Sequence, residues 1–90
     1  MSAVRILVIA ATRDPHRQAE ALRAALGLTL RGSRVEVAIE AAGGADEALA
    51  TPLARRAADT LRAFGHPVGA LAGEALAAAL ARAGRVEVWT

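Results

Sequence analysis

Three observations in the sequence predict a three-layer α/β domain of βαβαβαβ type with a four-stranded parallel sheet. Short aliphatic runs alternate with longer amphipathic segments along the whole chain. The first of these runs is almost continuously apolar, as in a parallel strand that is covered on both faces. Gly, Pro, Asp and Thr stand between the segments, where turns and helix caps require them. The 90 residues have no linker-like stretch, so we expect a single domain spanning residues 1–90.

The first strand and helix are expected at residues 4–11 and from residue 14 onward. The strand reads VRILVIAA. Asp14 is a good N-cap, Pro15 suits the first helical position, and Gly32 is expected to end the helix. Leucines at four-residue spacing form its predicted inner face: Leu22, Leu26 and Leu30.

The second strand and helix follow the same pattern. Residues 34–40 read RVEVAIE, so valine and isoleucine fall on one face and glutamate on the other. A helix follows, either from Asp46 or, more securely, from Thr51 as N-cap with Pro52 next, and Gly65 stops it. Its predicted inner stripe is Leu53, Ala57, Leu61 and Phe64.

The last third of the chain predicts a weaker strand, a helix and a final strand. PVGAL at residues 67–71 is a short strand candidate. Residues 73–83 are expected to form a helix with Leu76 and Leu80 inside, ended by Gly84. RVEVWT at residues 85–90 alternates again and reads as the closing strand.

Composition predicts a thin core. The apolar fraction is 54%, but alanine takes 25 positions and Phe64 and Trp89 are the only aromatic residues. A small chain with so little bulky apolar material is expected to bury part of its surface against another subunit. We therefore expect a homo-oligomer, or a hetero-oligomer with a related subunit.

Charge is unevenly distributed along the chain. Six arginines against two acids give residues 1–34 a net charge of +4, while four acids without a base give residues 35–54 a net charge of −4. All 11 basic residues are arginine, which accounts for the calculated pI of 11.0 although the net charge is only +2. The segregation indicates solvated faces or, alternatively, charge complementarity between subunits.

Several classes of function are disfavoured. Without cysteine there is no disulfide, zinc–thiolate site or thiol catalysis, and no phosphate-loop motif occurs. His16 and His66 belong to opposite edges of the predicted sheet, so no metal or other cofactor is expected. Stacking aromatics and a basic cluster are lacking, which argues against nucleic acid. No apolar run is long enough for a bilayer and no leader pattern opens the chain, which predicts a cytoplasmic protein.

The loops at the carboxyl edge of the sheet are the expected place for a ligand. In a parallel sheet these loops and the helix N-termini gather at one edge, which favours an anion. Thr12 and Arg13 are the candidate ligand-binding side chains, and the alternative is that Thr12 only helps to cap a helix while Arg13 is solvated. The glycines of the neighbouring loops complete this candidate site: Gly43, Gly44 and Gly73.

The pattern of the chain resembles the DsrE/DsrF/DsrH-like (Tus-type) sulfur-relay family. The resemblance is carried by the opening aliphatic strand, TRDP, and ALRAALGLTLRGSRVEVAIEAAGG, followed by LRAFGHPVGALAGEAL and VEVWT. It implies a sheet with the first strand inside, in the order 3-2-1-4. It also implies assembly, because members of that family form trimers or hetero-oligomers in which some subunits lack the reactive cysteine.

In sulfur-transferring members of that family, the corner before the third helix carries a cysteine. Ala72 stands at the matching position of this sequence. The resemblance therefore implies a scaffold without its nucleophile, a non-catalytic oligomerising subunit associated with sulfur relay. The alternative is a module that binds a small anion or a nucleotide-like ligand at the carboxyl edge. An enzyme would need Asp14, Glu74 or a histidine to converge on one pocket with a neighbouring subunit.

Overall fold

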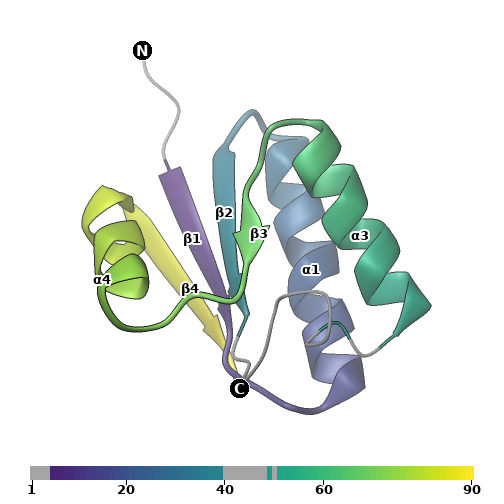
Figure 1. Ribbon diagram of the computed structural model, residues 1–90. Helices are drawn as coiled ribbons and strands as arrows, with labels where there is room; N and C mark the ends of the chain where they lie inside the picture. Colours follow the sequence, from purple (N-terminus) through teal and green to yellow (C-terminus); the bar gives the residue numbers. More distant parts are fainter. Residues whose placement is uncertain (1–4, 40–48, 50) are drawn as a thin grey trace.

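The computed structural model describes residues 5–39, 49 and 51–90. These residues form four strands and three helices, labelled as in Figure 1. The order along the chain is β1 (Arg5–Ala10), α1 (Pro15–Thr29), β2 (Arg34–Ile39), α3 (Pro52–Ala63), β3 (Val68–Gly69), α4 (Gly73–Arg82) and β4 (Arg85–Trp89).

The sheet is parallel and has the order β3-β2-β1-β4, as predicted. β1 pairs with β2 on one side and β4 on the other, so, like β2, it is an inner strand of the sheet. This position suits its apolar sequence RILVIA. β3 is only two residues long and β4 is the opposite edge strand.

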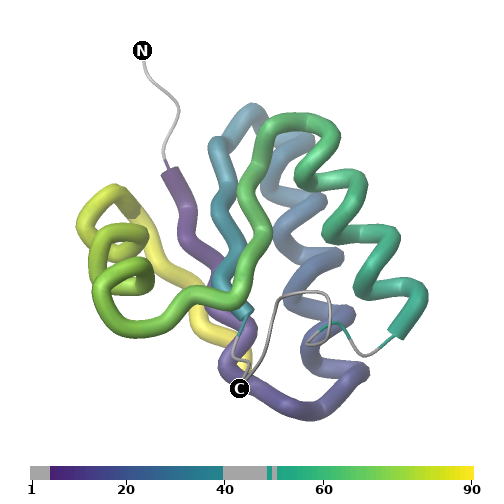
Figure 2. Tube along the Cα trace, in the orientation of Figure 1, coloured from purple at the N-terminus to yellow at the C-terminus, as the bar shows by residue number. Residues whose placement is uncertain are grey.

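The helices form two unequal layers. α1 and α3 lie together on one face of the sheet, and α4 lies alone on the other face (Figures 1 and 2). Asp14 caps α1 and Thr51 caps α3, each followed by proline, as the sequence predicts. Gly65 takes a positive φ of 83° after α3, a conformation that favours glycine. Within the described residues, no helix is long and apolar enough to cross a membrane.

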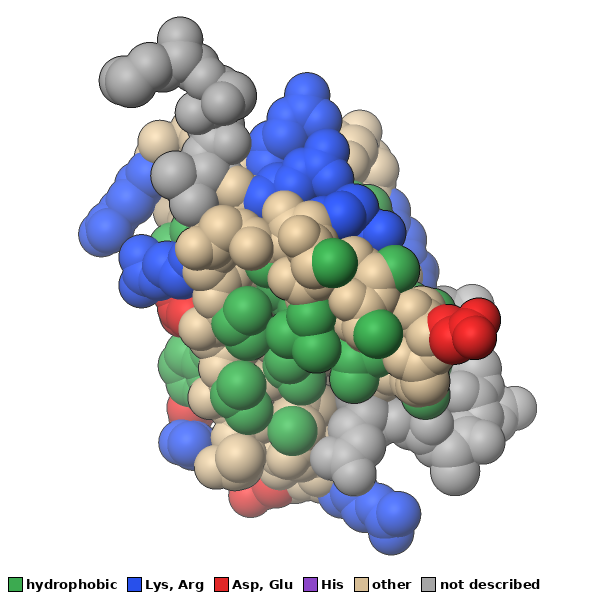
Figure 3. Space-filling model, turned by 90° about the vertical axis from the view of Figure 1, so that its left-hand side faces the viewer, with side chains coloured by type: hydrophobic (Ala, Val, Ile, Leu, Met, Phe, Trp, Pro, Cys, Tyr) green, Lys and Arg blue, Asp and Glu red, His purple; other side chains and the backbone are tan. Residues whose placement is uncertain are grey.

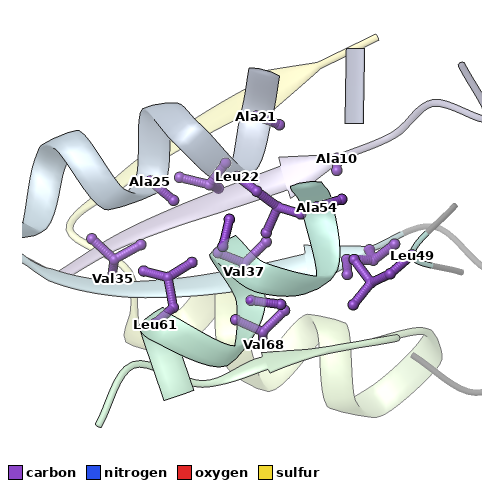
Figure 4. Packing of buried hydrophobic residues seen from close by; sticks show 14 of the residues in the cluster. Ala10, Ala21, Leu22, Ala25, Val35, Val37, Leu49, Ala54, Leu61 and Val68 are labelled. Carbon is purple, nitrogen blue, oxygen red and sulfur yellow. The ribbon is translucent and has the colours of Figure 1, made fainter. Parts of the chain in front are cut away.

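The main core lies between the sheet and the two-helix layer. Val35, Val37 and Ile39 of β2 point into it, as their alternation predicts. Figure 4 shows Val35 and Val37 among side chains of α1, such as Leu22, and of α3, such as Leu61. Leu49 closes one end of this cluster and is almost fully buried.

The core beneath α4 is much smaller. Its buried residues are Leu7 of β1, Ala38 of β2 and Ala79 of α4, with a few partly buried apolar residues around them. A single helix is about 10 Å wide, and strands lie about 4.8 Å apart, so α4 covers about two of the four strands. The second face of the sheet is therefore incompletely covered.

Four large side chains that the periodicity assigns to the interior are exposed: Leu30, Leu53, Phe64 and Leu80. Leu30 and Phe64 follow the last residues of α1 and α3, so neither continues its helical stripe. α3 instead buries a stripe made mostly of alanine, namely Ala54, Ala57, Ala58 and Leu61. Small side chains let the helix approach the sheet closely, and this leaves the bulkier Leu53 at the rim.

Candidate functional site

Side chains in the turn after β1 cap the N-terminus of α1. Thr12 Oγ1 accepts a hydrogen bond from the Asp14 backbone N–H at 3.1 Å. Asp14 Oδ1 accepts one from the His16 backbone N–H at 2.9 Å. Arg13 is exposed, and in the part of the chain that the structure describes it makes no hydrogen bond or ion pair. Within the described contacts, this turn acts as the N-terminal cap of α1.

The corner before α4 carries no reactive side chain. Ala72 is the N-cap residue, with extended backbone and no side-chain hydrogen bond. Gly73 follows with a φ of 55° and is exposed. Thr12, Arg13 and Gly73 share the carboxyl edge, but α1 and α4 leave that edge toward opposite faces of the sheet (Figure 1). Gly43 and Gly44 lie outside the described residues, so ligand binding at this edge stays a prediction.

Arg17 ties the end of the chain to α1 at the same edge. Its Nε donates to the Thr90 carbonyl oxygen at 3.0 Å. Its guanidinium carbon lies 5.7 Å from the centroid of the Trp89 ring, within the range of a cation–π contact. The same guanidinium is 3.6 Å from Glu20. These contacts hold the edge strand β4 against α1, and they give Trp89 a structural role.

A cavity of about 560 Å³ opens at the amino edge of the sheet, opposite the edge at which the sequence predicts a ligand. Its lining comes from the starts of β1 and β2, the loop between α3 and β3, and the end of α4. The lining residues are Arg5, Ile6, Leu7, Arg34, Val35, Glu36, Phe64, Gly65, His66, Pro67, Ala79, Arg82 and Ala83.

Arginine dominates the polar lining of this amino-edge cavity. Arg5 and Arg34 are partners in the parallel register of β1 and β2. Both belong to the α4 face, because Arg5 alternates with Leu7 and Arg34 with Glu36, which is hydrogen-bonded to α4. Arg82 Nη2 lies 3.1 and 3.0 Å from the two carboxylate oxygens of Glu36. The charges of Arg82 and Glu36 neutralise each other, so Arg5 and Arg34 give the cavity lining an excess of two positive charges.

His66 is fixed in the wall of the cavity. The ring Nδ1 of His66 accepts a hydrogen bond from the Val35 backbone N–H at 3.2 Å. The backbone N–H of His66 donates to the Leu61 carbonyl oxygen at 2.9 Å. Since Nδ1 is an acceptor, the neutral ring carries its proton on Nε2. His16 lies at the other edge of the sheet, as predicted. Among the described residues, no group of three His, Cys, Asp or Glu side chains is placed to hold a metal ion.

Reasoning from the sequence missed this cavity because it followed the usual rule for parallel sheets, which directs attention to the carboxyl ends of the strands. A signal was nevertheless present. Arg5 is the second residue of the first predicted strand and Arg34 is the first residue of the second, and two neighbouring parallel strands in register bring such residues together.

The chain has no match among protein-family models, curated proteins or solved structures. Two features of the described residues bear on function: the incompletely covered sheet face beside α4 and the arginine-lined cavity at the amino edge.

Proposed function

We propose that this chain is a non-catalytic, DsrE-like subunit that assembles through the surface formed by α4 and β4 and serves as a scaffold in sulfur relay. The observation that supports assembly is the apolar outer surface of α4, on a sheet face that α4 alone does not cover.

α4 is apolar around most of its circumference. Residues 75–81 are all alanine or leucine, yet Ala79 is the one fully buried residue of the helix, and Leu80 is 42% exposed. A helix of this composition is usually buried on more than one side. Charges occur only at its two ends, as Glu74 and Arg82. The exposed middle of α4 is therefore suited to contact with another protein.

β4 extends the same apolar surface. Val86 and Val88 are in register with Leu7 and Ile9, so they point to the α4 face of the sheet. They are 41% and 57% exposed, because α4 does not reach over them. Figure 3 shows hydrophobic side chains gathered in the middle of this side of the molecule, with the charged ones around the margin. Such a patch with a polar rim is typical of an interface.

A second copy of the chain is the partner that fits this surface best. Two α4 helices packed antiparallel across a two-fold axis would bring their exposed alanines together and leave the charged ends, Glu74 and Arg82, at the margin of the contact. The alanines between them allow a close approach of the helices. A two-fold contact uses the same surface on both copies, so it forms a dimer and adds no further subunits.

The association with sulfur relay rests on the resemblance of the sequence and on the corner before α4. Ala72 stands where reactive members of that family carry their cysteine, and alanine cannot bear a persulfide. In this proposal the chain supplies the fold and its interface, and a cysteine-bearing relative supplies the chemistry.

Sedimentation velocity tests the assembly. We expect the wild-type chain to sediment as an oligomer and Val88→Glu, which places a charge in the patch, to sediment as a monomer. Leu30→Glu is the matched control, because it adds the same charge to an exposed leucine outside this surface and should leave the oligomer intact. A monomeric wild type, or equal loss of the oligomer in both variants, would contradict the proposal.

The sulfur-relay part needs a separate measurement. Affinity purification from the native cells, followed by native mass spectrometry, should recover a cysteine-bearing DsrE-like protein in a fixed ratio to this chain. Recovery of this chain alone as a homo-oligomer would retain the scaffold but remove its connection to sulfur relay.

A further inference from the structure

We infer that the amino-edge cavity binds a small organic phosphate, with Arg5 and Arg34 holding the phosphate group and Phe64 and Pro67 contacting the organic part. This site is separate from the carboxyl-edge loops, and the inference does not depend on the oligomeric role proposed above.

The phosphate-binding part is the arginine pair. Neighbouring strands of a sheet lie about 4.8 Å apart. Arg5 and Arg34 are register partners on β1 and β2, and both belong to the same face of the sheet. Neither has a carboxylate partner within the described residues. Like charges at neighbouring positions of two strands repel each other, and an anion bound between them removes this repulsion. Guanidinium groups bind the oxygens of phosphate with paired hydrogen bonds, which makes phosphate a suitable anion.

The charge of the cavity matches a phosphate monoester. Arg82 is engaged with Glu36, whose side chain is only 20% exposed, and the two groups neutralise each other. Arg5 and Arg34 then supply two positive charges, and a phosphate monoester carries about −1.5 to −2 at neutral pH. A carboxylate would balance only one of the two arginines. The charge balance therefore favours phosphate over carboxylate.

The remaining lining indicates an organic ligand instead of free phosphate. Apolar groups from Ile6, Leu7 and Ala79 line the cavity beside the arginines. Phe64 lines it as well and is 77% exposed, so its ring has a free surface for contact with a ligand. The volume of about 560 Å³ lies within the usual range for small-molecule sites.

His66 gives the organic part a polar contact. The ring Nδ1 accepts the Val35 N–H, so in the neutral ring the donor is Nε2–H. His66 lines the cavity, and this donor is therefore available to a ligand there. A wall residue held by two backbone hydrogen bonds loses little freedom when a ligand binds.

An NMR titration of the full chain with phenyl phosphate, at constant ionic strength, tests the site. We expect saturable shifts of the backbone amides in residues 5–7, 34–36 and 64–67. Arg5→Gln and Arg34→Gln should each weaken binding on the order of tenfold to a hundredfold, as for the loss of a charge-assisted hydrogen bond. Arg23→Gln is the control of equal charge, since Arg23 is exposed on α1 and does not line the cavity.

Two further probes identify the ligand chemistry. Benzoate keeps the ring but carries one charge, and inorganic phosphate lacks the ring, so both should bind more weakly than phenyl phosphate. Equal affinity for benzoate would overturn the assignment to phosphate, and equal affinity for inorganic phosphate would overturn the organic part. Absence of saturation, or equal weakening by Arg23→Gln, would overturn the site itself. The titration repeated on Val88→Glu should give the same affinity, which separates this site from the assembly.

Discussion

Arg5 and Arg34 are register partners at the starts of β1 and β2, and both belong to the face of the sheet that carries α4. Like charges in such positions destabilise a sheet. Glu36 is the acidic residue of the same cavity lining, and Arg82 engages both of its carboxylate oxygens. The amino edge of the sheet therefore has two arginines at neighbouring strand positions on one face, and a bound anion would relieve repulsion between them.

The arginine pair predicts a gain in stability when one member is removed. Arg34→Gln should raise the free energy of unfolding by about 0.2–1 kcal/mol at low ionic strength, because it removes the repulsion from Arg5. The gain should shrink as salt screens the charges. Urea unfolding at low and high sodium chloride measures both effects. A loss of stability at low salt would show that the two guanidinium groups do not interact unfavourably.

The exposed α4–β4 surface predicts a stability that depends on protein concentration. If a second copy covers Val86 and Val88, mass action stabilises the folded oligomer as the concentration rises. The melting temperature of the wild type should therefore increase over a hundredfold concentration range, and that of Val88→Glu should not. A flat series for the wild type would indicate a self-sufficient monomer.

The uncapped N-terminus of α4 can be improved. Ala72 has the extended backbone of an N-cap residue but no side-chain acceptor for the first N–H groups of the helix. Ala72→Ser should supply that acceptor and raise the free energy of unfolding by about 0.5–2 kcal/mol. Thermal and urea unfolding measure the change. The same substitution at Ala78, in the middle of α4, should not stabilise, and equal effects at both positions would argue against capping.

The same corner should activate a thiol. In Ala72→Cys the new side chain stands at the N-terminus of α4, where the helix dipole favours the thiolate, so the thiol pKa should fall below its usual range. Ala81→Cys, near the C-terminal end of the same helix, is the control and should not show this decrease. The pH dependence of alkylation measures both. Identical profiles would mean that the corner offers no activation.

His66 should stabilise the chain through its hydrogen bond to Val35. Val35 is buried, and its N–H donates to His66 Nδ1 at 3.2 Å. His66→Ala removes this acceptor and should cost about 1–3 kcal/mol of unfolding free energy. His66→Asn offers its carbonyl oxygen in a similar position and should recover part of the loss. Equal destabilisation of both variants in urea unfolding would argue that the hydrogen bond contributes little.

The candidate site was only partly accessible from the sequence. The sequence predicts capping roles for Thr12 and Asp14, and both accept capping hydrogen bonds in the structure. The cavity at the amino edge was not foreseen, because its arginines are 29 positions apart and only strand pairing brings them together. Gly43 and Gly44 lie outside the described residues, so that part of the carboxyl-edge site remains a prediction.

The sequence by itself determined the order of strands and helices and the places where the helices begin. These depend on interactions between residues a few positions apart, such as the caps at Asp14 and Thr51. Tertiary structure decided which apolar side chains are buried and which charges meet. Leu53 is exposed because α3 packs through its alanine stripe, Leu80 is exposed because it lies on the uncovered side of α4, and Arg5 lies beside Arg34 because β1 and β2 pair in that register. Both outcomes depend on contacts between distant segments, and a local pattern of residues does not encode them.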